Sequence, residues 1–174
     1  MAPMRTLTRL NTCAAAVTVL VSPATTYAVG TAGAEGAGTT VVFDAKLRRC
    51  DFSLVTFAVQ VPHPSLGTGY AVVHTTGSKA VADVHLVDAP EPGTHFDVGL
   101  IQVPRPASAT CGPGDPGTAF TGLDTDGAGS GNATVQDSIR PGTTGVWVIV
   151  EQPNPHSQSP AEFYTSEFVV PVRA

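Results

Sequence analysis

The stretch HFDVGLIQV, residues 95–103, decides the fold that we predict for this chain. Its apolar residues from Phe96 to Leu100 alternate with His, Asp and Gly, and a period of two places them on one face of an extended strand. The dipeptide Pro92-Gly93 suits the centre of a type II turn, where proline presets φ and glycine accepts a positive φ. The pattern predicts a half-buried antiparallel strand entered through a tight turn.

A second alternating run, residues 81–88, precedes this strand, and we expect the two runs to form a hairpin at the middle of a sandwich. The tetrapeptide Ser159-Pro160-Ala161-Glu162 fits a capping box and predicts one helical turn. Further strands are expected at 39–44, 52–61, 68–75, 118–120, 133–136, 145–151 and 167–172. Eight or nine short strands predict an all-β, immunoglobulin-like two-sheet antiparallel sandwich, with closure into a barrel as the alternative.

The composition agrees with many short strands rather than long helices. The chain has 174 residues, 42% hydrophobic and 13% charged, with Gly 18 and Pro 15. Such dense turn residues interrupt any long helical period. Apolar residues occur on both faces of the run 145–151. This pattern predicts a central strand that is covered on each side, or that has one side covered by a loop.

The first residues have the pattern of a cleaved signal peptide, 1–28. Arg5 and Arg9 precede a short apolar run, 13–21, and small residues lead to Ala28, with cleavage near Ala32 or Ala34 as the alternative. The run is too short to span a bilayer, so we expect a secreted chain without a membrane span after cleavage. Residues 29–38 predict a disordered lead-in, and 39–174 a β-sandwich domain.

Removal of the signal peptide leaves 7 Lys and Arg against 14 Asp and Glu, a formal charge of −7. This charge repels phosphate backbones, so nucleic-acid binding is disfavoured, as is binding to anionic membranes. The remaining cysteines, Cys50 and Cys111, form an even pair in an oxidising compartment and predict one disulfide bond. A reactive thiol would need a neighbouring base, which the sequence does not show.

The leader, the pair Cys50 and Cys111, and the runs PGTHFDVGLIQV (92–103) and PGTTGVWVIVEQP (141–153) together resemble a known group. They are similar to small secreted proteins of actinobacteria, including mycobacteria, with an immunoglobulin-like domain and no assigned activity. The resemblance covers most of the mature chain. It implies the fold and the location, and it carries no catalytic residue across.

Two histidines and two carboxylates are the first candidates for chemistry. His85 and His95 each have a carboxylate two residues away on their own face, Asp83 and Asp97, and in one hairpin register the four could form a Zn²⁺ or Cu²⁺ patch. A slip of one residue would move every side chain to the opposite face. The alternative is a solvated face with cross-strand His and Asp pairs.

The acidic turn at 124–129 is the second candidate. Asp124 and Asp126 could converge on Ca²⁺, although Ala128 and Val135 stand where an EF-hand-type loop needs ligands. The alternative is a hairpin turn in which the aspartates accept hydrogen bonds from local backbone N–H groups.

Two proline-rich loops are the third candidate. The first, 103–116, carries Arg105 and Asp115, and the second, 152–160, carries Asn154 and His156. Stiff loops on a sandwich can bind a partner at little entropic cost, and plain connection is the alternative.

These observations favour a non-enzymatic secreted or cell-envelope-associated binding module without a cofactor. No nucleophile elbow or phosphate loop is present in the sequence. The expected partner is an unknown protein or envelope component. The alternatives are a metal-binding surface protein that uses the His85 and His95 face, and a purely structural secreted protein.

Overall fold

The computed structural model describes residues 37–55 and 66–173, and these residues form nine strands and no helix. The strands are β1 (Thr39–Asp44), β2 (Thr68–Thr76), β3 (Lys79–Val87), β4 (His95–Val103), β5 (Thr118–Asp124), β6 (Ser130–Ser138), β7 (Gly145–Gln152), β8 (Glu162–Ser166) and β9 (Val170–Pro171). The all-β prediction is confirmed. No helix suited to crossing a membrane occurs in the described ranges.

Some predictions concern residues outside those ranges. They include the signal peptide, 1–28, nearly all of the lead-in, 29–38, and the part of the predicted strand 52–61 that follows Val55. The part of that strand that is described, 52–55, forms only one isolated bridge, between Leu54 and Arg48.

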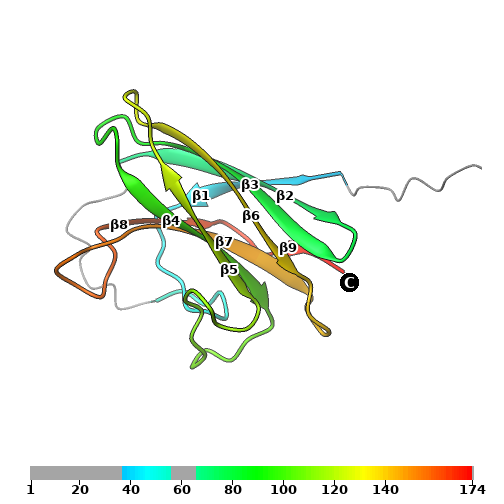
Figure 1. The fold of residues 1–174 in the computed structure, drawn as a ribbon. Helices are drawn as coiled ribbons and strands as arrows, with labels where there is room; N and C mark the ends of the chain where they lie inside the picture. The colour runs from blue at the N-terminus through cyan, green and yellow to red at the C-terminus, as the bar shows by residue number, and fades with distance from the viewer. Residues whose placement is uncertain (1–36, 56–65, 174) are drawn as a thin grey trace, which may run out of the picture. The chain divides into compact units, whose positions relative to one another are not determined.

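The strands form one antiparallel path in the order β5-β4-β7-β8-β1-β2-β3-β6, and β9 pairs with β7 (Figure 1). β1 joins two halves of this path, because its first residues pair with β2 and its last two, Phe43 and Asp44, pair with β8. We call β1, β2, β3 and β6 the first half-sheet, and β5, β4, β7, β8 and β9 the second. The end strands β5 and β6 lie side by side, so the sheet is barrel-like and nearly closed.

The predicted hairpin between 81–88 and 95–103 is wrong. Both strands form where expected, but β3 pairs with β2 and β6, whereas β4 pairs with β5 and β7. The connection 88–94 therefore crosses from one half-sheet to the other. Alternation tells which face of a strand is apolar, and it leaves the pairing partner open.

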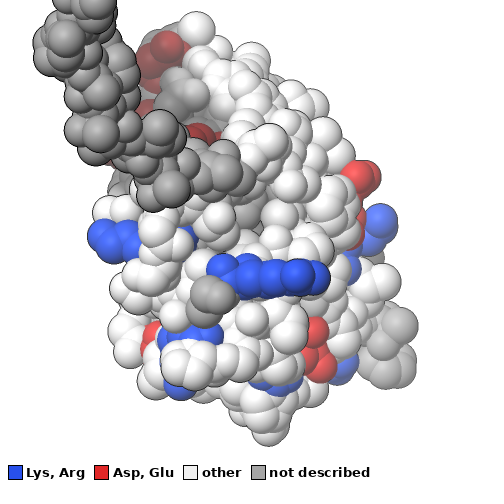
Figure 2. Space-filling view, turned by 90° about the vertical axis from the view of Figure 1, so that its right-hand side faces the viewer, with Lys and Arg blue, Asp and Glu red and all other residues white. Residues whose placement is uncertain are grey.

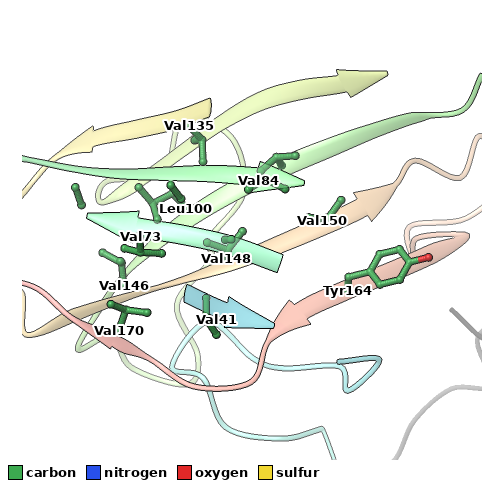
Figure 3. Packing of buried hydrophobic residues seen from close by; sticks show 14 of the residues in the cluster. Val41, Val73, Val84, Leu100, Val135, Val146, Val148, Val150, Tyr164 and Val170 are labelled. Carbon is green, nitrogen blue, oxygen red and sulfur yellow. The ribbon is translucent and has the colours of Figure 1, made fainter. Parts of the chain in front are cut away.

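The main core lies between the two half-sheets (Figure 3). Phe96, Val98 and Leu100 of β4 are fully buried there, as the alternation predicts. They pack with side chains of the other strands, among them Val41, Val73, Val84, Leu86, Val135, Val146, Val148, Val150 and Tyr164. Burial of these side chains is the main stabilising contribution to the fold.

A smaller cluster covers the outer face of the second half-sheet. Trp147 and Ile149 of β7 pack there with Ile101, and Phe52 lies over Trp147 with ring centroids 5.7 Å apart. The prediction that 145–151 is a central strand covered on both sides is therefore confirmed. The covering segment is the chain that follows β1.

The disulfide bond between Cys50 and Cys111 holds this covering segment in place. It joins two positions 61 residues apart, as the two remaining cysteines predict. Closing a loop of that length should contribute about 4 kcal/mol in the chain-entropy model. The bond fastens the segment after β1 to the connection between β4 and β5.

The helical turn predicted at 159–162 is wrong. Glu162 begins β8, and all five residues of this strand are buried. The capping-box pattern is local, whereas β8 gains a ladder with β7 from Ile149 to Gln152. The strand predicted at 167–172 is reduced to β9, and β5 and β6 are longer than expected.

The turn prediction before β4 is confirmed by the backbone. Gly93 has φ 76°, and the glycines of the other two Pro-Gly-Thr tripeptides, Gly117 and Gly142, have φ 74° and 86°. A side chain at these positions would be strained, because L residues rarely adopt a positive φ.

Candidate functional site

The four residues predicted as a metal patch do not meet. Asp83 and His85 lie on the outer face of the first half-sheet, and His95 and Asp97 lie on the outer face of the second. The main core separates the two faces. A four-ligand site is not formed, because the hairpin on which it depended is not formed.

Each histidine has a local partner instead. His85 Nδ1 lies 2.7 Å from Asn132 Oδ1. His95 Nδ1 lies 2.7 Å from Asp124 Oδ1, and its Nε2 lies 3.6 Å from Asp97. The hydrogen bond to Asp124 is the main reason why the pKa of His95 is raised. These contacts match the alternative of solvated faces with cross-strand pairs.

The acidic turn also matches its structural alternative. Asp126 Oδ1 accepts the backbone N–H groups of Ala128 at 2.8 Å and Ser130 at 2.9 Å. These two bonds lower the pKa of Asp126, because they stabilise its ionised form. Asp124 is engaged with His95. The two carboxylates therefore serve the turn and the neighbouring strand.

Three of the four side chains singled out in the proline-rich loops, those of Arg105, Asp115 and Asn154, hold the loops themselves, and His156 is exposed. The Arg105 guanidinium donates to the carbonyl oxygens of Thr110, Pro116 and Gly117 at 2.9–3.1 Å. Asp115 Oδ2 accepts the Gly112 N–H at 2.8 Å. In the second loop, Asn154 Oδ1 accepts the backbone N–H of His156 at 2.9 Å.

Charge separates the molecule into two ends. The connections β3–β4, β5–β6 and β7–β8 lie at one end, because neighbouring strands are antiparallel (Figure 1). This end, with the adjoining strand ends, carries Asp88, Glu91, Asp97, Asp124, Asp126, Glu151 and Glu162. The corresponding segments 84–99, 119–136 and 146–167 contain no Lys or Arg. We call it the acidic end.

The opposite end holds the connections β2–β3, β4–β5 and β6–β7 and the end of β9. It carries Lys79, Arg105, Arg140 and Arg173 together with Asp115 and Asp137. Figure 2 views the side on which the C-terminus lies, and Lys and Arg side chains are spread across that face with some Asp and Glu side chains among them. We call this the basic end.

A groove of about 560 Å³ opens at the basic end. The connections β4–β5 and β6–β7 form its walls, and both contribute proline and arginine residues. The lining residues include Gln102, Pro104, Arg105, Pro106, Pro116, Arg140, Pro141 and Thr143. Arg105 is used by the loop itself, whereas Arg140 is exposed and forms no ion pair with any described residue.

Gln102 fixes the floor of this groove. Its side chain is 3% exposed, and its Nε2 donates to Asp137 Oδ2 at 2.6 Å and to the Ser138 carbonyl oxygen at 2.9 Å. Its Oε1 accepts the Arg140 N–H at 2.9 Å and the Thr143 hydroxyl at 2.7 Å. All four hydrogen-bonding positions of the amide are thus used and tie β4 to β6 and to the β6–β7 wall. The backbone N–H of Gln102 donates to the Gly117 carbonyl oxygen of the β4–β5 wall at 2.9 Å, so both walls are attached to this residue.

Three carboxylates converge at the acidic end: Asp88, directly after β3, Glu91, in the β3–β4 connection, and Glu162, the first residue of β8. One oxygen of each lies within 4.8 Å of the others, and the part of the chain that the structure describes contains no other such group of three His, Cys, Asp or Glu residues. Two ionised carboxylates at that distance repel by roughly 3 kcal/mol in an effective dielectric of about 20.

The backbone places Asp88 firmly. Its N–H donates to the Gly129 carbonyl oxygen at 2.7 Å, and its own carbonyl oxygen accepts the Glu91 N–H at 3.2 Å. Gly129 has φ 78°, and a Cβ there would come within 2.2 Å of the Asp88 carbonyl oxygen. The β5–β6 turn therefore packs directly on the backbone of Asp88, and only glycine allows this approach.

Glu162 is held by two donors. Its Oε1 accepts the Leu66 N–H at 2.7 Å and a short hydrogen bond from the Tyr164 hydroxyl. The Tyr164 ring packs in the core 6.3 Å from Phe96, and its hydroxyl points away from the valine side chains (Figure 3). Burial, with the neighbouring Glu162, raises the pKa of Tyr164 well above its usual range, so the phenol stays neutral and donates.

Asp88 differs from Glu162 in having no donor. Its exposed fraction is 0%, and neither carboxylate oxygen has a hydrogen-bond partner in the described structure. Burial raises the pKa of Asp88 to about 6, and the charges of Glu162 and Glu91 act in the same direction. A buried carboxylate in this setting needs a proton or a cation.

Sequence reasoning missed this cluster for a clear reason. The capping-box pattern places Glu162 at the start of a helical turn, Asp88 ends the predicted strand 81–88, and no prediction involves Glu91. The available signal was the acidic pair just before the Pro92-Gly93 turn, but the third carboxylate, Glu162, follows 71 residues after Glu91 (162 − 91) at the start of β8. Only the pairing of β8 with β7 brings it there.

Comparison of the chain with protein-family models, with curated proteins and with solved structures found no match. Function must therefore be argued from the two ends of the molecule, since a fold by itself does not imply one.

Proposed function

We propose that this chain is a secreted or cell-envelope-associated, non-enzymatic binding module, and that the groove at the basic end holds its partner. The observation that carries the proposal is the exposed Arg140 guanidinium, which has no ion pair among the described residues and lines a groove whose floor is fixed by Gln102. An exposed cation beside a preformed concave surface is suited to an acidic group on a partner.

The walls of the groove favour binding with little loss of conformational entropy. Pro104, Pro106, Pro116 and Pro141 line it, and proline fixes φ before any partner arrives. Arg105 ties its own loop to three carbonyl oxygens, and the disulfide bond at Cys111 fastens the same loop to the segment after β1. Preorganised surfaces bind more tightly for the same contacts.

The charges of the basic end favour an acidic partner. Its two carboxylates are already engaged, Asp137 with Gln102 and Asp115 with the Gly112 N–H. Of the two arginines that line the groove, Arg105 is used by its own loop, so Arg140 is the cation left to meet a partner there. We infer an envelope component or a protein segment that carries carboxylate or phosphate groups, bound in a salt-dependent way.

Location and fold family belong to the same proposal. The predicted signal peptide and the disulfide bond support export, since disulfides persist in oxidising compartments. Two half-sheets that face each other across one core support an immunoglobulin-like sandwich. A chain that binds nothing would instead be a purely structural secreted protein.

The test is differential capture from culture supernatant and envelope extract of the source organism. Immobilised wild-type protein and the Arg173→Glu control are expected to retain the same component, and Arg140→Glu is expected to lose at least nine-tenths of it, roughly the tenfold effect of a lost charge-assisted contact. Arg173 lies at the same end but does not line the groove. Equal retention by Arg140→Glu, or no specific retention by wild type, would contradict the proposal.

A further inference from the structure

We propose that Asp88, Glu91 and Glu162 form a Ca²⁺ site that joins the two half-sheets at the acidic end. The site lies at the opposite end from the groove, so it stands or falls independently of the proposed function. It differs from the turn at 124–129 that the sequence suggested.

The first observation is the origin of the three carboxylates. Asp88 follows β3 of the first half-sheet, Glu162 begins β8 of the second, and Glu91 lies in the connection that crosses between them. Their oxygens converge within 4.8 Å. A cation bound by all three would link the half-sheets directly, which no hydrogen bond between these carboxylates can do while they are ionised.

The second observation is that Asp88 is buried and lacks a partner. Both of its oxygens are shielded from solvent, and no described group donates to either one. The other two have donors: the Leu66 N–H and the Tyr164 hydroxyl for Glu162, and the Gln152 amide, at 3.4 Å, for Glu91. Buried carboxylates without donors are rare in native proteins, and a bound ion is a standard explanation.

The surroundings favour a cation over a single shared proton. Segments 84–99, 119–136 and 146–162 carry seven carboxylates and no Lys or Arg, and no described Lys or Arg forms an ion pair with Asp88, Glu91 or Glu162. Glu162 Oε1 already accepts two hydrogen bonds, from the Leu66 N–H and the Tyr164 hydroxyl, and neither of these donors reaches Asp88. Clustered charge of one sign concentrates counter-ions of the other.

The donor atoms select the type of cation. All three side chains offer oxygen, and no His or Cys belongs to the cluster, so a hard cation fits better than Zn²⁺. Mg²⁺ usually retains most of its water and takes one or two carboxylates, whereas Ca²⁺ accepts several carboxylates in an irregular shell. Glu91 is only partly buried, so water can complete such a shell.

Calorimetric titration of the full chain with CaCl₂, after chelator treatment and at about pH 7, tests the site. One binding event is expected, with a dissociation constant of about 10⁻⁴ to 10⁻³ M, as in extracellular modules. Thermal denaturation should show a melting temperature that rises with Ca²⁺ concentration, because the ion binds only the folded state.

Three variants locate the ion. Asp88→Asn keeps the shape of the side chain, and Glu91→Gln changes a partly exposed turn residue. Each is expected to weaken Ca²⁺ binding at least tenfold. Asp124→Asn removes the same charge from an 80% exposed side chain at the same end and is expected to bind as wild type.

Three results would overturn the inference. The first is the absence of both heat and thermal shift up to about 10 mM Ca²⁺, tenfold above the weakest expected constant. The second is a loss of binding in Asp124→Asn equal to that in Asp88→Asn, which would place the ion at the 124–129 turn. The third is Mg²⁺ binding as tight as Ca²⁺ binding, which would refute the choice of ion.

Discussion

Two buried polar side chains, Gln102 at the basic end and Asp88 at the acidic end, differ in whether the protein supplies their hydrogen-bond partners. The Gln102 side chain forms four hydrogen bonds, two with residues of β6 and two with residues of the β6–β7 connection. Asp88, at the acidic end, is equally buried, and its carboxylate receives none from the described residues. The protein satisfies every hydrogen-bonding position of the Gln102 amide. The Asp88 carboxylate, in contrast, needs a proton or a bound cation from outside the described chain.

The two ends are also fastened differently. The disulfide bond holds the loop that forms a wall of the groove at the basic end. At the acidic end, the inferred Ca²⁺ site would hold β3 and β8 together. A covalent bond is permanent in an oxidising compartment, whereas a bound ion follows its concentration, so only the acidic end would respond to calcium.

The largest expected change in stability comes from a substitution of Gln102. Gln102→Glu removes the donors to Asp137 and the Ser138 carbonyl oxygen and sets a second carboxylate beside Asp137. We expect the free energy of unfolding to fall by about 3 kcal/mol, because buried acceptors lose their donor and like charges meet. Urea denaturation measures the change. The exposed Gln136→Glu is the matched control, with an expected change below about 0.5 kcal/mol.

A loss below about 1 kcal/mol in Gln102→Glu would contradict this role, because it would mean that the network contributes no more than one ordinary hydrogen bond.

At Asp88 the opposite substitution, of a carboxylate by an amide, should stabilise the calcium-free protein. Asp88→Asn removes a buried charge, and the new amide can donate to Glu91 or Glu162. In chelator-treated protein we therefore expect the free energy of unfolding to rise by about 1 kcal/mol, measured by urea denaturation. Asp83→Asn changes an exposed aspartate of β3 and serves as the control. Destabilisation of the calcium-free protein by Asp88→Asn would show that the charge already has a partner.

The smallest expected effect on stability concerns His95, whose pKa responds to the neighbouring carboxylates of the acidic end. Its hydrogen bond with Asp124 raises its pKa, so protonated His95 contributes stability that is complete below the unfolded value near 6.5 and is lost as pH rises through the folded value. Because His95 is half exposed, the contribution is a few tenths of a kcal/mol. Titration of the ring by NMR should show a lower pKa in Asp124→Asn and no change in Asp126→Asn.

An unchanged His95 pKa in Asp124→Asn would contradict the assignment of that hydrogen bond as the main cause.

Much of the fold could be predicted from local patterns. The alternation in β4 predicted its buried face, and the apolar residues on both faces of β7 predicted a central strand. The pair of cysteines predicted the disulfide bond. Pairing was predicted less well. β3 and β4 carry patterns that suit any apolar partner, so the expected hairpin and the metal patch that depended on it were wrong.

The candidate sites show the same division. Arg105 and Asp115 were identified in the correct loop, because proline-rich runs are visible in sequence, although both side chains serve that loop. Arg140, Asp88 and Glu162 were not identified, since nothing near them in sequence marks their neighbours in space.

The sequence by itself determined the all-β class, the faces of the main strands, the disulfide bond and the turns at the Pro-Gly-Thr tripeptides, because these depend on periodicity and on the φ preferences of single residues. Tertiary structure alone decided which strands pair, and with them the charge of each end and the meeting of Asp88 with Glu162. Contacts between distant segments depend on how whole strands bury their apolar faces together, which no local pattern records.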